Sequence, residues 1–192
     1  MKFSKLSAIA EIKFCTITPS RSKPSATPTN WLVCANFLAD NRIDGRSQTN
    51  YVAPDGNWLL NKDDIVVKRI TPTFVNYMEE VDDDVYCGNN LIIVTPGQKV
   101  DPKYLAMVLN EQISNLSDES SVGAVMKSVS RSDLEEMSIP LPDMETQRSM
   151  GQLWYMGIEL KKKKNRLAEL ENIQMNNAIK KAIKMLGGKR NG

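Results

Sequence analysis

The C-terminal stretch constrains the fold of this chain more than any other feature, because no proline follows Pro142. Asp143 and Glu145 supply the acidic side chains that favour a helix N-terminus. Gly187 and Gly188 are typical of a helix end. A helix over residues 143–186 would be about 65 Å long, far longer than the helices of ordinary globular domains.

Apolar side chains within this stretch alternate at spacings of three and four residues, the pattern of a coiled-coil seam. The expected partner-facing positions are Leu153, Met156, Leu160, Leu167, Leu170, the polar Gln174 and Asn177, and then Ile179 and Ile183. A single helix cannot bury such a stripe alone. The apolar stripe could pack against either the rest of the chain or another molecule. We favour intermolecular pairing, because the preceding domain is too small to cover the whole length.

The first 140 residues predict a mixed α and β domain. Short runs rich in Val and Ile, bounded by turn residues, indicate strands at 9–17, 31–34, 64–70 and 91–94. Residues 18–30 and 50–57 read as turn-rich. Asp101 and Pro102 predict the cap and first position of a helix. Ser132 and Glu135 have the spacing of a capping box for a second, short helix.

The expected fold class is therefore α+β: a mixed α/β globular domain followed by a long C-terminal coiled-coil helix. We expect the domain over residues 1–142 and the helix, for dimerisation and partner docking, over residues 143–192.

The chain has no histidine and only three cysteines, Cys15, Cys34 and Cys87. Without histidine, a Ser-His-Asp or Cys-His nucleophile system cannot be built. No C-x-x-C pair or phosphate loop is present. We therefore expect reduced core thiols, no metal site, no cofactor and no catalytic residues. No apolar run reaches the about 20 residues of a membrane helix and no secretory signal is evident, so we expect a cytoplasmic protein without membrane contact.

Charge is distributed unevenly along the chain. Residues 1–75 carry 10 basic and 6 acidic side chains, residues 76–150 carry 5 and 14, and residues 151–192 carry 10 and 3. A polyanion such as DNA would be repelled by the middle segment and attracted by the flanking ones. A DNA-contacting surface should therefore avoid the carboxylates at 79–84. Simple solvation of a surface would produce such charges too.

Three polar clusters in the predicted domain carry side chains that hydrogen-bond to base edges or phosphates. The expected DNA-binding residues are Asn36, Asn41, Arg42, Arg46, Gln48, Asn50 and Tyr51 in the first cluster, Lys68, Arg69 and Thr71 in the second, and Lys127, Ser128 and Arg131 in the third. Each cluster alone is a weak signal, because surface loops are usually polar. Together they favour a nucleic-acid ligand.

An ordered series of blocks adds a resemblance to a known family. The blocks span 60–67, 87–94, 101–105, 123–130 and 134–142, where Ile139-Pro140-Leu141-Pro142 precedes Gln147 and the long helix. This order resembles the target recognition domain of the specificity subunit of type I restriction-modification systems. One departure is Asp63-Asp64, where the family pattern has Gly-Asp before a strand.

The resemblance implies a non-enzymatic protein that reads one half of a split double-stranded DNA site and positions modification (methyltransferase) and restriction subunits. Full-length members carry two recognition domains and two helices, whereas this chain has one of each. It resembles half a subunit: either a natural half-length protein forming a homodimer through antiparallel helices, or a fragment. A two-fold dimer would read a palindromic, interrupted site.

Two other functions remain open on the sequence alone. One is a coiled-coil assembly or adaptor protein that never touches DNA. A small metal-dependent nuclease built from carboxylates and lysine is the remaining alternative.

Overall fold

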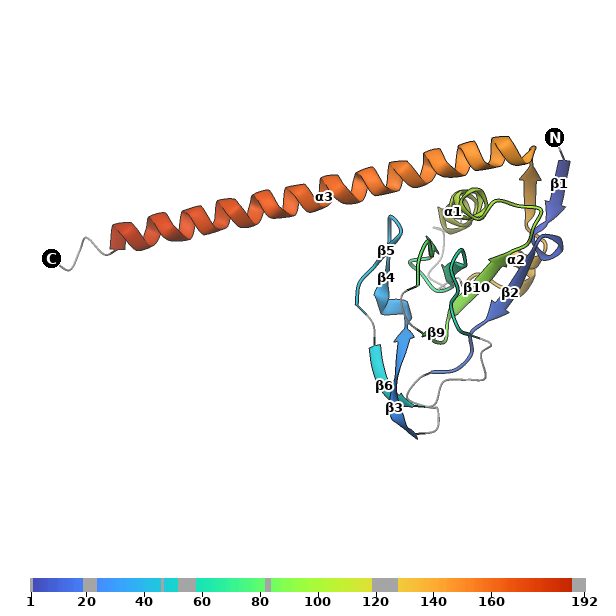
Figure 1. The fold of residues 1–192 in the computed structure, drawn as a ribbon, viewed down its shortest axis with the longest axis horizontal. Coiled ribbons are helices and arrows are strands. Elements are labelled where there is room, and N and C mark those ends of the chain that lie inside the picture. Colours follow the sequence, from blue (N-terminus) through green and yellow to red (C-terminus); the bar gives the residue numbers. More distant parts are fainter. Residues whose placement is uncertain are drawn as a thin grey trace. The chain divides into compact units, whose positions relative to one another are not determined.

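The structure is a computed structural model, and it describes residues 2–18, 24–45, 47–51, 58–81, 84–118 and 128–187. It contains two compact units, Met1–Tyr155 and Met156–Gly192. The first unit mixes strands and helices, and the second continues a long helix (Figure 1). The predicted α+β class with a long C-terminal helix is confirmed.

A four-stranded sheet, in the order β2-β10-β7-β8, forms the centre of the first unit. Its strands are β2 (Ala10–Phe14), β7 (Ile65–Lys68), β8 (Phe74–Tyr77) and β10 (Leu91–Pro96), and neighbouring strands are antiparallel. Three of the predicted strands therefore exist, with ends shifted by a few residues.

A second sheet joins strands that are distant in sequence, in the order β6-β3-β9. It contains β3 (Pro24–Leu32), β6 (Ser47–Tyr51) and β9 (Val85–Cys87). A short pair, β4 (Phe37–Leu38) with β5 (Arg42–Ile43), is held to β8, where Asn76 donates to the Leu38 and Arg42 carbonyls.

Strand β3 corrects two of the sequence-based predictions. Residues 24–30, predicted as turns, belong to this strand, whose ladder with β6 shifts register between Pro24 and Thr29. Pro24 is the first residue of the strand and Pro28 lies where the register shifts, two positions at which strands tolerate proline. The predicted strand at 31–34 is wrong at its end, because β3 stops at Leu32 and Cys34 begins the 3-10 helix η3 (Cys34–Asn36).

The helices begin at side chains that cap their first turn. Asp101 Oδ1 accepts a hydrogen bond from the Tyr104 N–H at 3.0 Å, at the start of α1 (Pro102–Asp118), as predicted. The short helix α2 spans Arg131–Glu135, and its capping box is Ser130 with Asp133. The predicted box, Ser132 with Glu135, was two residues too late.

Apolar side chains on both faces of the central sheet make two cores. In β7, Ile65 and Val67 belong to one core and Val66 to the other, because successive side chains of a strand point to opposite faces. The first core packs against η1 (Leu6–Ala8), α1, α2 and the start of α3, and the second against β3 and β9. Burial on both faces explains why β7 and β10 are apolar without alternation.

The start of α3 (Met144–Gly187) is fixed to the first unit by polar contacts. Asp143 caps the helix by accepting the Thr146 N–H at 2.9 Å. The buried Gln147 side chain accepts the Asp101 N–H at 2.9 Å and donates to the Pro142 carbonyl at 2.9 Å. Pro142 directly follows β11 (Ser138–Leu141), which pairs with β1 (Lys2–Lys5) and leads into the helix (Figure 1).

Two further contacts hold the third turn of the helix. A Cβ added to Gly151 would lie 2.4 Å from the Tyr104 nitrogen, so only glycine permits this approach of α3 to α1. Glu79 accepts hydrogen bonds from the Tyr155 hydroxyl at 2.6 Å and the Lys103 ammonium at 2.9 Å. The bonds from Tyr155 and then Lys103 lower the pKa of Glu79.

The second unit leaves its apolar seam exposed. Leu160 is 54%, Leu167 57% and Ile183 63% exposed. Among the described residues, no helix is long and apolar enough to span a membrane. The helix begins within one residue of the predicted boundary at 142/143, and the compact unit continues to Tyr155. The functional assignment of the two spans stays a prediction.

The cysteines are free thiols. Cys15 and Cys87 are buried in the second core, where burial and then contact with Cys15 raise the pKa of Cys87. Cys34 is half-buried and packs against the same core, so it lies at the border of the core.

Candidate nucleic-acid interface

The fold brings together two of the three predicted donor clusters. Ile70 and Ser128 form an antiparallel bridge, and the Val129 N–H donates to the Arg69 carbonyl at 3.0 Å. The Arg69 side chain crosses the same junction, donating from Nε to the Val129 carbonyl at 3.0 Å. Arg69 also donates to the Ser128 hydroxyl at 3.4 Å. The second and third clusters therefore form one surface.

This surface lies at one end of the central sheet. The antiparallel registers place Phe14, Lys68, Phe74 and Leu91 at the same end of the sheet. Phe14 pairs with Ile92, Leu91 with Lys68, and Lys68 with Phe74. We call this group of residues, together with Arg69, Thr71, Ser128 and Arg131, the basic end of the sheet. Loops held by a rigid sheet are frequent sites of binding residues.

Aromatic rings hold two cations of the basic end. The Arg131 guanidinium lies 4.3 Å from the centre of the Phe14 ring and donates to Glu135 at 2.9 Å. The Lys68 ammonium lies 5.0 Å from the centre of the Phe74 ring. Cation–π contacts of this kind limit the freedom of long basic side chains. A restrained cation loses less entropy when it binds a phosphate or a base edge.

The turn between β9 and β10 adds polar groups that the sequence reasoning missed. The Cys34 thiol donates to the Asn89 and Asn90 carbonyls, each at 3.6 Å, and the Arg69 N–H donates to the Asn90 carbonyl at 3.0 Å. Burial raises the pKa of Cys34, and the nearby Lys68 charge partly opposes this shift. Phe14 and Asn89 were not predicted at this end of the sheet. Asn89 comes two residues before the predicted strand at 91–94, a position that could have drawn attention to it, whereas the predicted strand at 9–17 placed Phe14 in its interior.

The first cluster divides into structural and exposed residues. Asn36 accepts the Val33 N–H at 2.8 Å and donates to the Asp44 carbonyl at 2.9 Å. Asn41 accepts the Tyr77 N–H and donates to the Tyr77 carbonyl at 3.2 Å. Both side chains fix the β4–β5 segment, whereas Arg42 and Asn50 are exposed.

The remaining predicted positions lie outside what the structure describes. Arg46 and Lys127 are outside the described residues. Gln48 and Tyr51 are described only as backbone, in β6.

Acidic residues lie at the other end of the same sheet. Asp63 and Asp64 directly precede β7, and Glu79 follows β8, so these carboxylates are a strand length from Lys68. Asp64 accepts the Thr95 hydroxyl at 2.6 Å and the Asn61 N–H at 2.8 Å. Burial raises the pKa of this carboxyl despite these bonds. The sheet thus has a basic end suited to an anion and an acidic end that would repel one.

The described residues also differ from the ligand sets of metal sites. Within the described part of the chain, no group of three or more Cys, Asp or Glu side chains is placed to hold a metal ion. The basic end instead offers guanidinium, ammonium and hydroxyl groups, which bind phosphates and the donor and acceptor groups of bases.

Comparison with known families identifies the chain. The family model for the type I restriction modification DNA specificity domain matches residues 1–181. The chain belongs to this family, as the sequence blocks predicted. A search of curated proteins gives no match.

Solved structures share the fold. A chain from a study of complex assembly and conformational transition of the type I R-M system is 17% identical, with a TM-score of 0.61 over 93% of this chain and 44% of that one. The HsdS subunit from Thermoanaerobacter tengcongensis is 20% identical, with a TM-score of 0.56 over 83% and 37%. The S subunit of the type I system from M. genitalium is 15% identical, with a TM-score of 0.56 over 91% and 44%. The chain therefore spans less than half the length of each of these proteins.

Proposed function

We propose that the first unit reads one half of a bipartite double-stranded DNA site, and that the chain acts as the specificity component of a type I restriction-modification complex. The protein itself catalyses no reaction. Its role is to place modification and restriction subunits on the site. The family match over residues 1–181 supports this proposal.

The observation that carries the proposal is the junction of two donor clusters at the basic end of the sheet. Arg42, Asn50, Lys68, Thr71, Ser128 and Arg131 are the proposed DNA-contacting residues, and Arg69 positions the two loops. Asn36 and Asn41 are not retained as base-reading residues, because their amide groups bond to backbone within the domain. Arg46, Gln48, Tyr51 and Lys127 stay predictions.

The second unit provides the proposed assembly surface. Its seam from Met156 to Ile183 has no apolar cover among the described residues, and exposed leucines of this number favour burial against protein. We propose that two copies pair through antiparallel α3 helices, so that two identical reading units face inverted half-sites. The same helices would dock the modification subunits, in the cytoplasm where chromosomal DNA lies.

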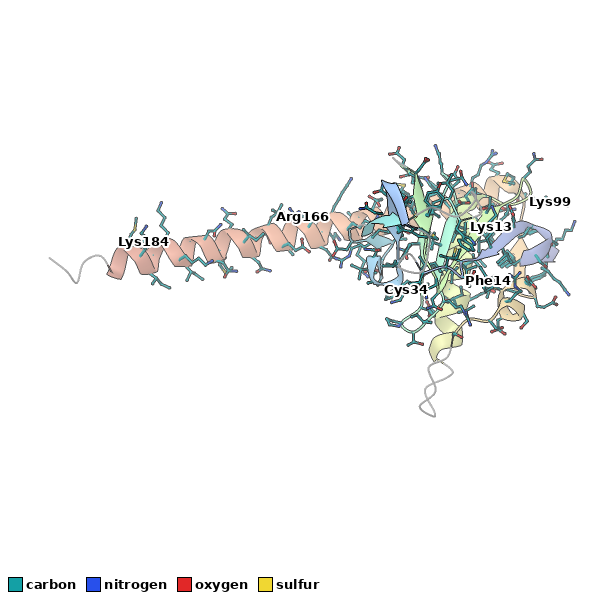
Figure 2. All side chains as sticks on the ribbon, turned by 90° about the horizontal axis from the view of Figure 1, so that it is seen from below. Lys13, Phe14, Cys34, Lys99, Arg166 and Lys184 are labelled. Carbon is teal, nitrogen blue, oxygen red and sulfur yellow. The ribbon has the colours of Figure 1, made fainter. Side chains whose placement is uncertain are left out.

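Charge-removing substitutions at the two ends of the sheet test the proposal. Lys68→Gln with Arg131→Gln should weaken binding to a selected duplex by about tenfold or more, since each lost contact costs about 1–3 kcal/mol. Lys99→Gln is the matched control, because Lys99 is exposed and follows the opposite end of β10 (Figure 2). Fluorescence anisotropy with labelled duplexes measures both.

Several results would contradict this proposal. Equal affinity of the double variant and the control would exclude the basic end as the reading surface. A wild-type protein that binds partner subunits but no DNA would instead be an assembly protein. Cleavage of plasmid DNA by the isolated chain with Mg²⁺ would indicate the nuclease alternative.

A further inference from the structure

The two units carry opposite net charge. Residues 1–155 contain 15 basic and 20 acidic side chains, whereas residues 156–192 contain 10 basic and 3 acidic ones. The unit proposed to read DNA is therefore net negative, and the helix unit is strongly positive. A net-negative reading head gains little from long-range attraction to a polyanion. The attraction must then come from another part of the chain.

Positive charge in the second unit is concentrated toward its C-terminal half. No Asp or Glu follows Glu171, while Lys180, Lys181 and Lys184 belong to α3. Earlier in the same helix, Lys162 pairs with Glu159 at 2.7 Å and Arg166 pairs with Glu169 at 3.1 Å. The nearest helical carboxylate to Lys180 is nine residues away in the sequence, about 14 Å along the axis.

The lysines of this half lie on one face of the helix, which borders the seam at Asn177. Lys180 and Lys184 are four residues apart, so they lie on one face, about 6 Å apart along the axis. At about 100° per residue, Lys162 and Arg166 lie on this same face, and Leu160 and Leu167 on a different one. Nearer to these lysines, Lys184 follows the seam residue Asn177 by seven residues and lies beside it, whereas Ile179 and Ile183 lie about 100° around the axis from Lys180 and Lys184. Long lysine side chains at the border of a paired seam can still carry their ammonium groups outward into solvent. Figure 2 labels Arg166 and Lys184 on the helix.

We infer that the Lys180–Lys184 face of α3 binds the phosphate backbone of duplex DNA without reading its sequence. The inference rests on the proposed function and extends it: the helix supplies affinity, and the first unit supplies sequence preference. Duplex DNA presents one negative charge per about 1.7 Å of its axis, so two ammonium groups about 6 Å apart can reach successive phosphates. Pairing two copies would double the positive charge, and a polyanion would relieve the resulting repulsion.

Cations near a helix C-terminus have another physical role, because they stabilise the helix macrodipole. Lys184 lies in the last turn and would contribute in this way. That role predicts a loss of helix content when the lysines are neutralised. Phosphate contact predicts unchanged helix content and a change in how DNA affinity depends on salt.

The test compares two double variants of the full-length chain on one duplex of unselected sequence. Lys180→Gln with Lys184→Gln should reduce the slope of log affinity against log salt by about 1.8, since each phosphate contact contributes about 0.9. The matched control, Lys162→Gln with Arg166→Gln, removes the same charge at the same spacing on the same face. Its cations are held by glutamates, so its slope should change by less than half as much.

Three further readouts complete the design. Both variants should retain the wild-type helix content by circular dichroism and the wild-type oligomeric state by sedimentation. The ratio of affinities for a selected and an unselected duplex should stay constant. An unchanged slope in the Lys180/Lys184 variant, or an equal change in both variants, would overturn the inference. So would loss of helix content as the sole effect.

The failure of the inference can be distinguished from that of the proposed function. Wild-type protein that selects a sequence while the Lys180/Lys184 variant keeps its slope contradicts only the inference. If that variant keeps its slope but no longer captures the methyltransferase subunit, the face binds an acidic protein surface, and the inference is wrong. Wild-type protein without any salt-dependent DNA binding contradicts both.

Discussion

The first three turns of α3 and the remainder of the helix have opposite relations to their surroundings. In the first three turns, Gln147 and Tyr155 are buried, and Gly151 lies against the backbone of α1. Beyond Met156, the leucines and isoleucines of the seam are 47% to 63% exposed. One continuous helix is thus packed against its own domain at its start and exposes apolar side chains along its remainder. The start of the helix fixes the first unit, and the remainder is the part that we propose associates with protein.

The largest effect should come from charge placed in the seam. Leu160→Glu with Leu167→Glu should weaken self-association or capture of the partner subunit by at least about a hundredfold, because a buried unpaired charge is costly. Asn165→Glu with Asn172→Glu is the matched control, since these exposed positions have the same spacing and lie off the seam. Sedimentation velocity measures both. Association that survives the leucine variant would show that the seam is not the interface.

Glycines in the two parts of α3 should respond in opposite directions to the same substitution. Gly151→Ala should destabilise the first unit by about 1–3 kcal/mol or more, because the new Cβ would overlap the Tyr104 nitrogen. Gly157→Ala meets nothing within 4 Å, and should stabilise the helix by up to about 1 kcal/mol. Urea denaturation gives both values. A Gly151→Ala protein as stable as wild type would contradict the close packing of α3 against α1.

The smallest effect concerns acid stability. The pKa of Glu79 is lowered in the folded protein, so its contribution to stability is present above the unfolded value and is lost as pH falls through the folded pKa. The side chain is 44% exposed, and solvent screening keeps this contribution below about 1 kcal/mol. Wild type should therefore lose more stability than Glu79→Gln as pH falls below about 4.5. Parallel stability curves for the two proteins would show that the Tyr155 and Lys103 contacts are not coupled to the ionisation of Glu79.

Elements with local signals were predictable from the sequence, and elements built by distant pairing were not. Asp101 caps α1 where expected, because a cap acts on residues within one turn. Asp143, expected as an acidic residue at the start of the long helix, caps that helix. Strand β3 depends on pairing with β6 and β9. Its prolines led to a prediction of turns, because the sequence of the segment contains no sign of these partner strands. The hydrophobic pattern within a segment gives no information on a partner strand that lies far away in the chain.

The candidate site was predictable as clusters but not as one surface. Lys68 and Arg131 were expected to be binding residues, yet their contacts with Phe74 and Phe14 depend on the registers of the sheet. Asn36 and Asn41 have side chains suited to base reading, and the fold uses them to hold its own backbone. Residue type alone does not separate an amide that binds a ligand from one that fixes a loop.

Selection from a random duplex library is the most direct test of the division between a reading unit and an assembling helix. The purified chain, with its methyltransferase subunit present, should enrich a two-part sequence whose halves are inverted copies separated by unread base pairs. Recovery of a pool as random as the starting library would contradict the account.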